Sequence, residues 1–392
     1  MKAIPLSPID YIFIGAGSHP VTFAFEYKNT IEAAHLRSSL GETLKHFPLL
    51  RSKLIRISHD TCAFELADEG LSFETIHSPE TFEDTQHVNQ FVSPVASIEG
   101  EPLTRIKLTQ TPGGSVLGVS ISHALVDGFS YFHFLASWAR VAREQPILEP
   151  SQQRELLIPE PADRHVPITA EDVLARCGLF WDAKRHDSAD EPPREERLII
   201  SKNQMKELLK EAQTTSDIPF TTNDVVTAFL WKEYVPGWCE DNNDPGTYVT
   251  LPFDFRRVLR AVPRTFFGCA LCFTTASIDC DSLGHAPLGE LALLVRKAVG
   301  QARQDYILGS LRTLESLRRQ RGLGAMEEIH VRHPRNGIAV TNISRLPIQG
   351  LDFGSGIPTG FEVYTQMPQG AAILPAQDGV EIRVFLPSSS KH

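Results

Sequence analysis

The chain has 392 residues, of which 42% are hydrophobic and 22% are charged, as in an ordinary globular protein with room for about two domains. Its formal net charge of −10 argues against nucleic-acid and anionic-membrane partners. No apolar run reaches transmembrane length, and residues 1–10 lack the apolar core of a signal peptide, so we expect a cytoplasmic protein with no membrane partner.

The first part of the chain alternates predicted strands with helices. Asn29-Thr-Ile-Glu32 fits a capping box for a helix that Pro48 ends. A polar stretch reaches residue 100, and Pro112-Gly-Gly114 then joins two alternating segments into a hairpin. The predicted strands, the last two of which form this hairpin, are 20–26, 52–57, 61–66, 103–108 and 115–122.

The run Ile121-Ser-His-Ala-Leu-Val-Asp-Gly128 follows this hairpin and has the spacing H-x-x-x-D-G. Apolar residues at helical spacing begin just after Gly128, so His123 lies between a strand end and a helix start, and Gly128 lets the backbone pack closely at the bend. Histidine is a natural general base near neutral pH. Taken alone the motif is weak, since a strand-end histidine is often structural. It is not accompanied by the clustered Cys and His of a zinc site or by the G-x-S-x-G of a hydrolase, so no metal is expected.

Residues 146–196 are rich in proline and charge, which is typical of a long crossover between two halves. Beyond them, Thr221-Thr-Asn-Asp224 caps a helix, and a long helical region at 287–320 carries basic residues of the kind that usually line a solvated face. The other predicted strands and helices are 196–201, 203–212, 247–253, 267–275, 337–342, 360–365, 371–374 and 380–386. We predict an α/β (α+β) fold with two similar domains, 1–145 and 197–392, joined by the crossover.

Six cysteines spread over this length do not make a disulfide framework. Cys269 and Cys272 form a C-x-x-C, but they lie in the apolar, strand-like run Phe266–Phe273 and not at the start of a helix. A thioredoxin-type redox motif is therefore not indicated. We predict that both are reduced cysteines in the core of a cytosolic protein.

Taken together, the motifs resemble those of the BAHD family of acyl-CoA-dependent acyltransferases, within the chloramphenicol-acetyltransferase and condensation-domain superfamily. Ser120–Ser130 matches the family's His motif, and Asp352-Phe-Gly-Ser-Gly356 resembles its second signature, D-F-G-W-G. The chain departs from the pattern at Ser355, in place of the usual Trp, and at Cys269, in place of the Asn of F-G-N. The other stretches with family counterparts, which extend the match over nearly the whole chain, are 6–10, 46–51, 222–231, 254–257 and 341–347.

The resemblance implies two similar CAT-like domains, each a mixed sheet with flanking helices, and an active-site tunnel at their interface. Acyl-CoA enters this tunnel from one face, and a small-molecule alcohol or amine acceptor enters from the other. His123 acts as general base, acyl-CoA is a co-substrate, and no further cofactor is implied. Thr341 and Asn342, at the end of a C-terminal strand, are candidate oxyanion donors, although Thr-Asn at a strand end as often has only a structural role there.

The same resemblance implies structural roles for several charged residues and glycines. The family counterpart of Asp127 points away from the cavity and pairs with an arginine, which by position is Arg256. A buried carboxylate needs such a partner. Asp352 has a similar structural role, and Gly354 and Gly356 supply turn conformations.

His19 lies in Ser18-His-Pro20, where a family stretch approaches the acceptor pocket, although an ordinary loop histidine fits the sequence equally well. Arg312 and Arg318 are candidates for binding the CoA phosphates. Three other functions stay open: a condensation-type enzyme with a carrier-protein-bound acyl donor, a fold member repurposed for cyclisation or isomerisation, and a non-catalytic binding protein. Ser122 occupies the position of the second histidine of condensation enzymes, which favours free acyl-CoA. We expect a monomer.

Overall fold

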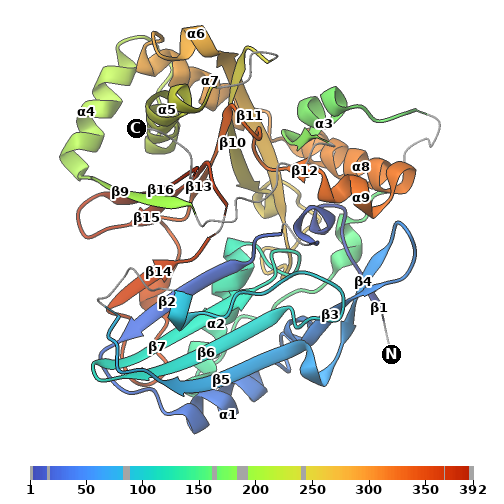
Figure 1. Cartoon of the computed structure of the whole chain (residues 1–392), viewed down its shortest axis with the longest axis vertical. Helices are drawn as coiled ribbons and strands as arrows, with labels where there is room; N and C mark the ends of the chain where they lie inside the picture. Colours follow the sequence, from blue (N-terminus) through green and yellow to red (C-terminus); the bar gives the residue numbers. More distant parts are fainter. Residues whose placement is uncertain are drawn as a thin grey trace. The chain divides into compact units, whose positions relative to one another are not determined.

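The computed structural model describes residues 3–15, 18–82, 89–160, 166–182, 193–239, 244–365 and 367–387, and these form the predicted mixed α/β fold. The chain divides into two compact units, each built from three separate stretches of sequence (Figure 1). Unit 1 comprises residues 1–158, 260–270 and 346–365. Unit 2 comprises residues 159–259, 271–345 and 366–392.

Unit 1 is built on a five-stranded sheet in the order β14-β2-β7-β6-β5. These strands are β14 (Gly360–Val363), β2 (Val21–Tyr27), β7 (Gly114–Ile121), β6 (Thr104–Thr111) and β5 (Leu71–His77). All pairs are antiparallel except β5 with β6. Every residue of the central strand β7 is buried, which agrees with its apolar sequence. A smaller sheet has the order β1 (Ala3–Pro5), β4 (Cys62–Leu66), β3 (Ser52–Arg56), and the helices α1 (Ala33–Thr43) and α2 (Gly128–Ala142) pack on each other.

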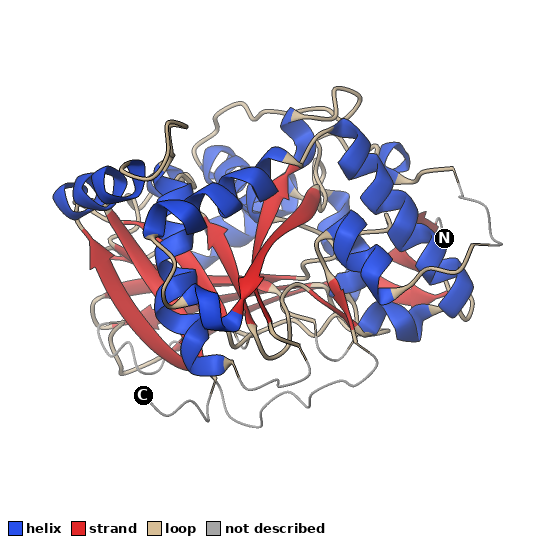
Figure 2. Cartoon of the chain, turned by 90° about the horizontal axis from the view of Figure 1, so that it is seen from above, coloured by secondary structure: helices blue, strands red, loops and turns tan. Residues whose placement is uncertain are grey.

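Unit 2 is built on a six-stranded sheet in the order β11-β10-β13-β15-β16-β9. These strands are β11 (Leu271–Asp279), β10 (Gly246–Asp254), β13 (Gly337–Asn342), β15 (Gly370–Pro375), β16 (Val380–Leu386) and β9 (Arg194–Ile200). The helices α4 (Lys202–Gln213), α5 (Thr222–Tyr234) and α7 (Leu288–Gly300), labelled in Figure 1, pack together. Figure 2 distinguishes the helices and strands of the chain by colour. The helices α3 (Ala170–Cys177) and α8 (Gln304–Arg321) pack on each other, and the short helix α9 (Leu323–Glu327) follows α8 in the chain and packs on it. A two-stranded sheet pairs β8 (Phe180–Trp181) with β12 (Ile329–His330).

Most predicted elements are present, with ends shifted by a few residues. The capping box at Thr221 and Asp224 is confirmed, because each side chain bonds the backbone N–H of the other. The capping box predicted at Asn29 is wrong: Glu32 is the N-cap of α1, and Asn29 Nδ2 donates instead to the Ser355 carbonyl at 2.7 Å. Two elements were not predicted, namely β5 in the polar stretch and α3 in the crossover.

The discontinuous units differ from the continuous domains expected from the sequence. Residues 346–365, which carry Asp352–Gly356, belong to unit 1 with the His123 motif and not to a C-terminal domain. The physical reason is strand pairing, since β14 adds to the edge of the sheet beside β2, with Phe361 opposite Phe25. Backbone hydrogen bonds and side-chain burial therefore join two segments from opposite ends of the sequence.

The cysteines follow the prediction in part. Cys269 and Cys272 are buried and neither is part of a disulfide, as predicted for core cysteines. Cys239 and Cys280, 41 positions apart, form a disulfide that the sequence analysis did not predict. Cys239 directly follows the 3-10 turn Val235–Trp238, and Cys280 begins the short helix α6 (Cys280–Leu283). Only tertiary folding brings these two elements together. Among the described residues, none of the helices has both the length and the apolar character needed to cross a membrane.

Candidate active site

His123 lies in the loop that connects the fully buried strand β7 to helix α2. β7 ends at Ile121, and Asp127 is the N-cap of α2, so five residues separate the strand from the cap. The hairpin and helix predicted on either side of the motif are both present. A histidine placed between two buried elements has a well-defined position, which a general base requires.

Ser122 fixes the backbone around this histidine. Its side chain is fully buried, its Oγ lies 2.7 Å from the Oγ of Ser97, and the same Oγ accepts a hydrogen bond from the N–H of Ala124 at 3.3 Å. Its carbonyl accepts the N–H of Leu125 at 2.9 Å. The residue before His123 thus has a structural role in the loop, one that a second histidine could not fill in the same space.

The imidazole of His123 stacks on the ring of Phe13, with centroids 4.1 Å apart and an interplanar angle of 12°. The side chain retains partial exposure, but its Nδ1 is buried and has no hydrogen-bond partner among the described residues. Burial lowers the pKa of His123, and the charge of Asp127 opposes this effect. The lowered pKa favours a neutral imidazole at pH 7, which is the form that accepts a proton.

Asp127 is a buried structural carboxylate. Its Oδ1 accepts the N–H of Ser130 at 2.8 Å and caps α2, and its Oδ2 accepts the N–H of Ala270 at 2.9 Å. Ser130 continues this connection, since its Oγ donates to the Gly268 carbonyl at 2.8 Å and lies 3.0 Å from the Gly268 N. The helix start therefore anchors the stretch 266–270, which resembles the family's F-G-N segment.

Gly128 does not have the role expected of it. Its backbone does not adopt a positive φ, and a Cβ added there would meet only Leu346 Cδ1, at 4.0 Å. The prediction that this glycine permits close packing at the bend is therefore wrong. The close approach occurs at Gly268, where a Cβ would lie 2.7 Å from the ring of Phe266 and 3.0 Å from Nη1 of Arg154.

The segment around Asp352 forms a tight turn in unit 1. Asp352 Oδ1 accepts the N–H of Gly354 at 2.8 Å and of Gly356 at 3.0 Å, and its Oδ2 lies 3.7 Å from Nη1 of Arg143. The two glycines have φ of 96° and 102°. Their predicted use as turn residues is confirmed, because this region of conformational space strongly favours glycine.

Arg256, Thr341 and Asn342 belong to unit 2. Arg256 is buried, and its Nη1 lies 3.0 Å from Asp254 Oδ1, while its predicted pairing with Asp127 stays a prediction. Thr341 is half-buried at the end of β13. Asn342 is exposed, and its Nδ2 donates to Asn223 Oδ1 at 2.9 Å, so it would have to leave this partner to bind an oxyanion.

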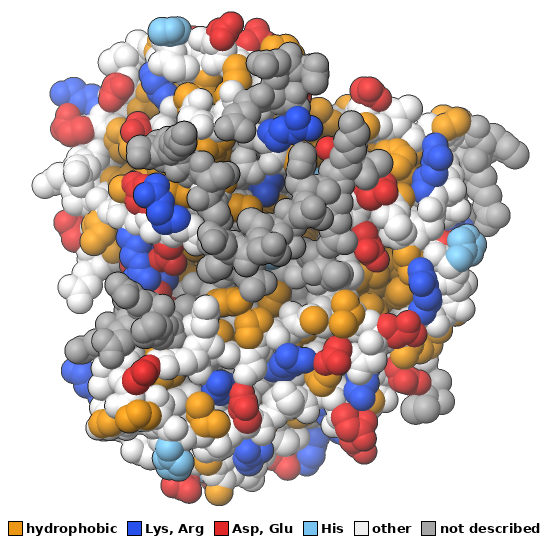
Figure 3. Space-filling model, in the orientation of Figure 1, with side chains coloured by type: hydrophobic (Ala, Val, Ile, Leu, Met, Phe, Trp, Pro, Cys, Tyr) orange, Lys and Arg blue, Asp and Glu red, His pale blue; other side chains and the backbone are white. Residues whose placement is uncertain are grey.

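The two arginines proposed for CoA binding differ sharply in their surroundings. Arg312 is exposed on α8. Arg318 is buried and pairs with Glu315, with Nη2 2.8 Å from Oε1, so the expectation that it offers a free surface charge is wrong. Helix periodicity places 318 on the inward face with 311 and 314. On the face drawn in Figure 3, the described basic and acidic side chains are interspersed, so charge alone does not mark an anion site there.

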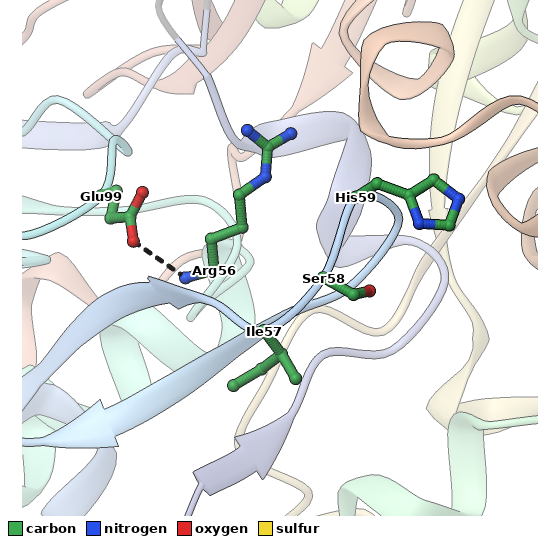
Figure 4. Close-up of a pocket in the computed structure, with 5 residues that line it drawn as sticks. All are labelled: Arg56, Ile57, Ser58, His59 and Glu99. Carbon is green, nitrogen blue, oxygen red and sulfur yellow. Dashed lines mark hydrogen bonds between the residues drawn. The ribbon is translucent and has the colours of Figure 1, made fainter.

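Three further features concern His19, metal binding and a surface hollow. His19 is half-buried in the loop before β2. Among the described residues, no group of three or more His, Cys, Asp and Glu side chains could hold a metal ion. A surface hollow of about 560 Å³ beside the β3–β4 hairpin contains none of the predicted site residues; Figure 4 shows its lining residues, which are Arg56, Ile57, Ser58, His59 and Glu99.

Sequence reasoning missed three residues that approach the His123 loop. Phe13 stacks on the imidazole, and Asp10 forms an ion pair with Arg154, which also bonds the carbonyl of Ala124. Asp10 was visible as the end of a stretch with a family counterpart, but its partner was not. Arg154 lies in the proline-rich crossover, where no local pattern distinguishes a buried arginine from an exposed one.

Comparison with known proteins identifies the family of this chain. The profile of the Transferase family matches residues 2–390. Anthranilate N-benzoyltransferase protein 1 from Dianthus caryophyllus is 25% identical over 89% of this chain and 80% of its own length. Coumaroyl-CoA:anthocyanidin 3-O-glucoside-6''-O-coumaroyltransferase 2 from Arabidopsis thaliana is 23% identical, covering 98% and 90%. The crystal structure of F. graminearum TRI101 complexed with coenzyme A and deoxynivalenol superposes with a TM-score of 0.79 at 15% identity, covering 99% of this chain and 96% of that one.

Proposed function

The chain belongs to the Transferase family, the BAHD acyltransferases, and we propose that it moves an acyl group from acyl-CoA to a hydroxyl or amine of a small molecule, with His123 as general base. The observation that carries the base assignment is the environment of His123, whose pKa burial lowers and whose ring is stacked on Phe13. The names of the relatives support both acceptor types, since they include an N-transferase and an O-transferase.

In the proposed reaction, neutral His123 takes the proton of the acceptor as its oxygen or nitrogen attacks the thioester carbonyl. The tetrahedral intermediate then expels the CoA thiolate, and the imidazolium returns the proton to the sulfur. General-base assistance of this kind is worth about 10²–10⁴ in rate. Thr341 and Asn342 are the proposed oxyanion donors, and a donor of this type contributes about 10²–10³ in kcat.

Substrate binding and the state of the protein in the cell are also part of the proposed function. Arg312 stays the candidate for the CoA phosphates, and His19 stays the candidate for the acceptor pocket. We also propose a cytoplasmic monomer. The structural role of Ser122 favours free acyl-CoA over a carrier-bound donor, because the second histidine of condensation enzymes is replaced here by a buried serine in the loop network.

The test is a screen of purified protein against CoA thioesters of different acyl length with pools of small alcohols and amines, measuring release of CoA thiol and the acylated product by mass spectrometry. Product that depends on both substrates supports the proposal, and its structure distinguishes O- from N-acylation. His123→Ala should remove nearly all product while leaving the thermal transition in place. Activity within about tenfold of wild type would contradict the general-base role.

A further inference from the structure

A short N-terminal segment contacts the histidine loop of unit 1 in two ways. The 3-10 turn Asp10–Phe13 is entirely buried. Its last residue, Phe13, covers one face of the His123 imidazole in a parallel stack. Its first residue, Asp10, reaches the same loop through an arginine far away in sequence.

That arginine is Arg154, whose side chain is almost completely buried with that of Asp10. Its Nη2 forms an ion pair with Asp10 Oδ2 and also donates to the carbonyl of Ala124 at 3.1 Å. The backbone N–H of Ser7 donates to the same carboxylate oxygen at 2.6 Å. The guanidinium lies over the ring of Phe64, 4.9 Å from its centroid, so a cation–π contact also fixes it.

The burial of this ion pair removes two charges from water, and the free energy of desolvation opposes their attraction. Burial raises the pKa of Asp10, and the charge of Arg154 opposes the rise, as expected for a carboxylate withdrawn from water. Replacing a buried pair by apolar side chains is often neutral or stabilising, so a buried pair needs another explanation than stability. Here the pair ends on a carbonyl group in the residue that follows His123.

We propose that Asp10, Phe13 and Arg154 are positioning residues for His123. Phe13 fixes the plane of the imidazole from one face and excludes water from it. Arg154, itself oriented by Asp10, fixes the carbonyl of Ala124, the residue after the histidine. This inference rests on the proposed function, in which a base misplaced by about 1 Å loses up to about 10²-fold in rate.

Phe13 is tested with Phe13→Leu, which keeps an apolar side chain but removes the flat ring face. The matched control is Phe25→Leu, a fully buried phenylalanine of β2 that stacks on Phe23. In Phe13→Leu, kcat should fall about tenfold with both KM values unchanged, and the acid limb of the pH–rate profile should move upward because water reaches the imidazole. In Phe25→Leu, only thermal stability should fall.

Arg154 is tested with Arg154→Met, which removes the donor, and Arg154→Lys, whose ammonium group can donate to both oxygens. The methionine variant should lower kcat at unchanged KM, and the lysine variant should recover part of the loss. Because Arg154→Met leaves Asp10 buried and unpaired, the double variant Asp10→Asn/Arg154→Met provides a folded reference without either charge. Arg383→Met, at a buried arginine of β16, controls for general loss of stability.

Nuclear magnetic resonance gives a readout that does not depend on turnover. The His123 signal is assigned as the one missing in His123→Gln, and its titration gives the pKa directly. An upward shift in Phe13→Leu and in the double variant, but not in Phe25→Leu or Arg383→Met, supports the proposal. Unchanged titration together with kcat within twofold of wild type overturns it. If wild-type protein transfers no acyl group, the proposed function fails, and the titration still decides the positioning roles.

Discussion

The carboxylate of Asp127 accepts the backbone N–H of Ala270 at 2.9 Å, although the two residues are 143 positions apart. The same carboxylate caps α2 through Ser130. One side chain of the H-x-x-x-D-G motif therefore orders both the helix after the histidine and the distant segment that precedes β11. This arrangement gives Asp127 a structural role beside the proposed general base.

Asp127→Ala should lower the free energy of unfolding by about 2–4 kcal/mol, because it removes a helix cap and leaves the buried N–H of Ala270 unsatisfied. Activity should fall with stability, which urea unfolding and initial rates will measure. Asp127→Asn, which keeps one acceptor oxygen, should be milder on stability. A variant as stable as wild type but inactive would indicate direct chemistry by Asp127. The double variant with Arg256→Ala checks the predicted pair, since additivity within about 0.5 kcal/mol would exclude direct coupling.

The pH dependence follows from the lowered pKa of His123. The proposed base must be neutral to accept a proton. The pKa that describes the loss of kcat/KM on the acid side should therefore lie below the ordinary histidine value of 6.5. The unfolded chain then binds a proton more readily than the folded chain, so the contribution of this group to stability should decrease as the pH falls through that value. His123→Gln should remove this part of the pH dependence. An acid limb well above pH 7 would be incompatible with the buried site.

Arg312 and Arg318 are expected to behave differently when replaced. Arg312→Glu should raise the KM for acyl-CoA and leave the acceptor KM nearly unchanged, and added salt should reduce the effect because exposed charges are screened beyond about 8–10 Å. Arg318→Met should lower stability, because the buried carboxylate of Glu315 loses one of its two arginine partners and keeps only Arg319, and it should leave the donor KM unchanged. Steady-state kinetics at two salt concentrations checks both. An unchanged donor KM in Arg312→Glu removes this residue from the proposed site.

The glycines of the two motifs provide a stability comparison. Gly354→Ala should lower the free energy of unfolding by about 1–2 kcal/mol, because an alanine at a φ of 96° is strained. Gly128→Ala should be nearly neutral, since the position begins a helix and has room for a Cβ. Chemical denaturation of both variants measures the difference. Equal losses at the two positions would contradict this assignment of conformational roles.

The local context of the H-x-x-x-D-G motif could be predicted because it depends on short-range patterns. Alternation along β7 and helical spacing after Gly128 place His123 between them, and both elements are found. β5 could not be recognised in the same way, since its burial alternates weakly at the edge of the sheet and its polar residues resemble a loop.

The supporting residues could not be predicted because their partners are distant in sequence. Arg154 and Asp10 are 144 positions apart, and nothing in the crossover indicates that this arginine is buried. The sequence alone predicts an exposed charge at Arg318, whereas an acidic residue three positions earlier on the helix allows the pair to be buried together. Local sequence patterns therefore predicted the location of His123 between a strand and a helix. Only tertiary contacts identify the residues around its loop.

The discontinuity of unit 1 also determines when this protein can fold during its synthesis. Asn29 donates to a carbonyl that is 326 positions later in the chain, and β2 gains its neighbour β14 only from that late segment. At typical translation rates the ribosome needs roughly 15–65 s to make this stretch. One edge of the sheet is therefore open throughout most of translation, and such an edge can pair with other nascent chains. We expect nascent chains that end before residue 346 to depend on chaperones to stay unaggregated.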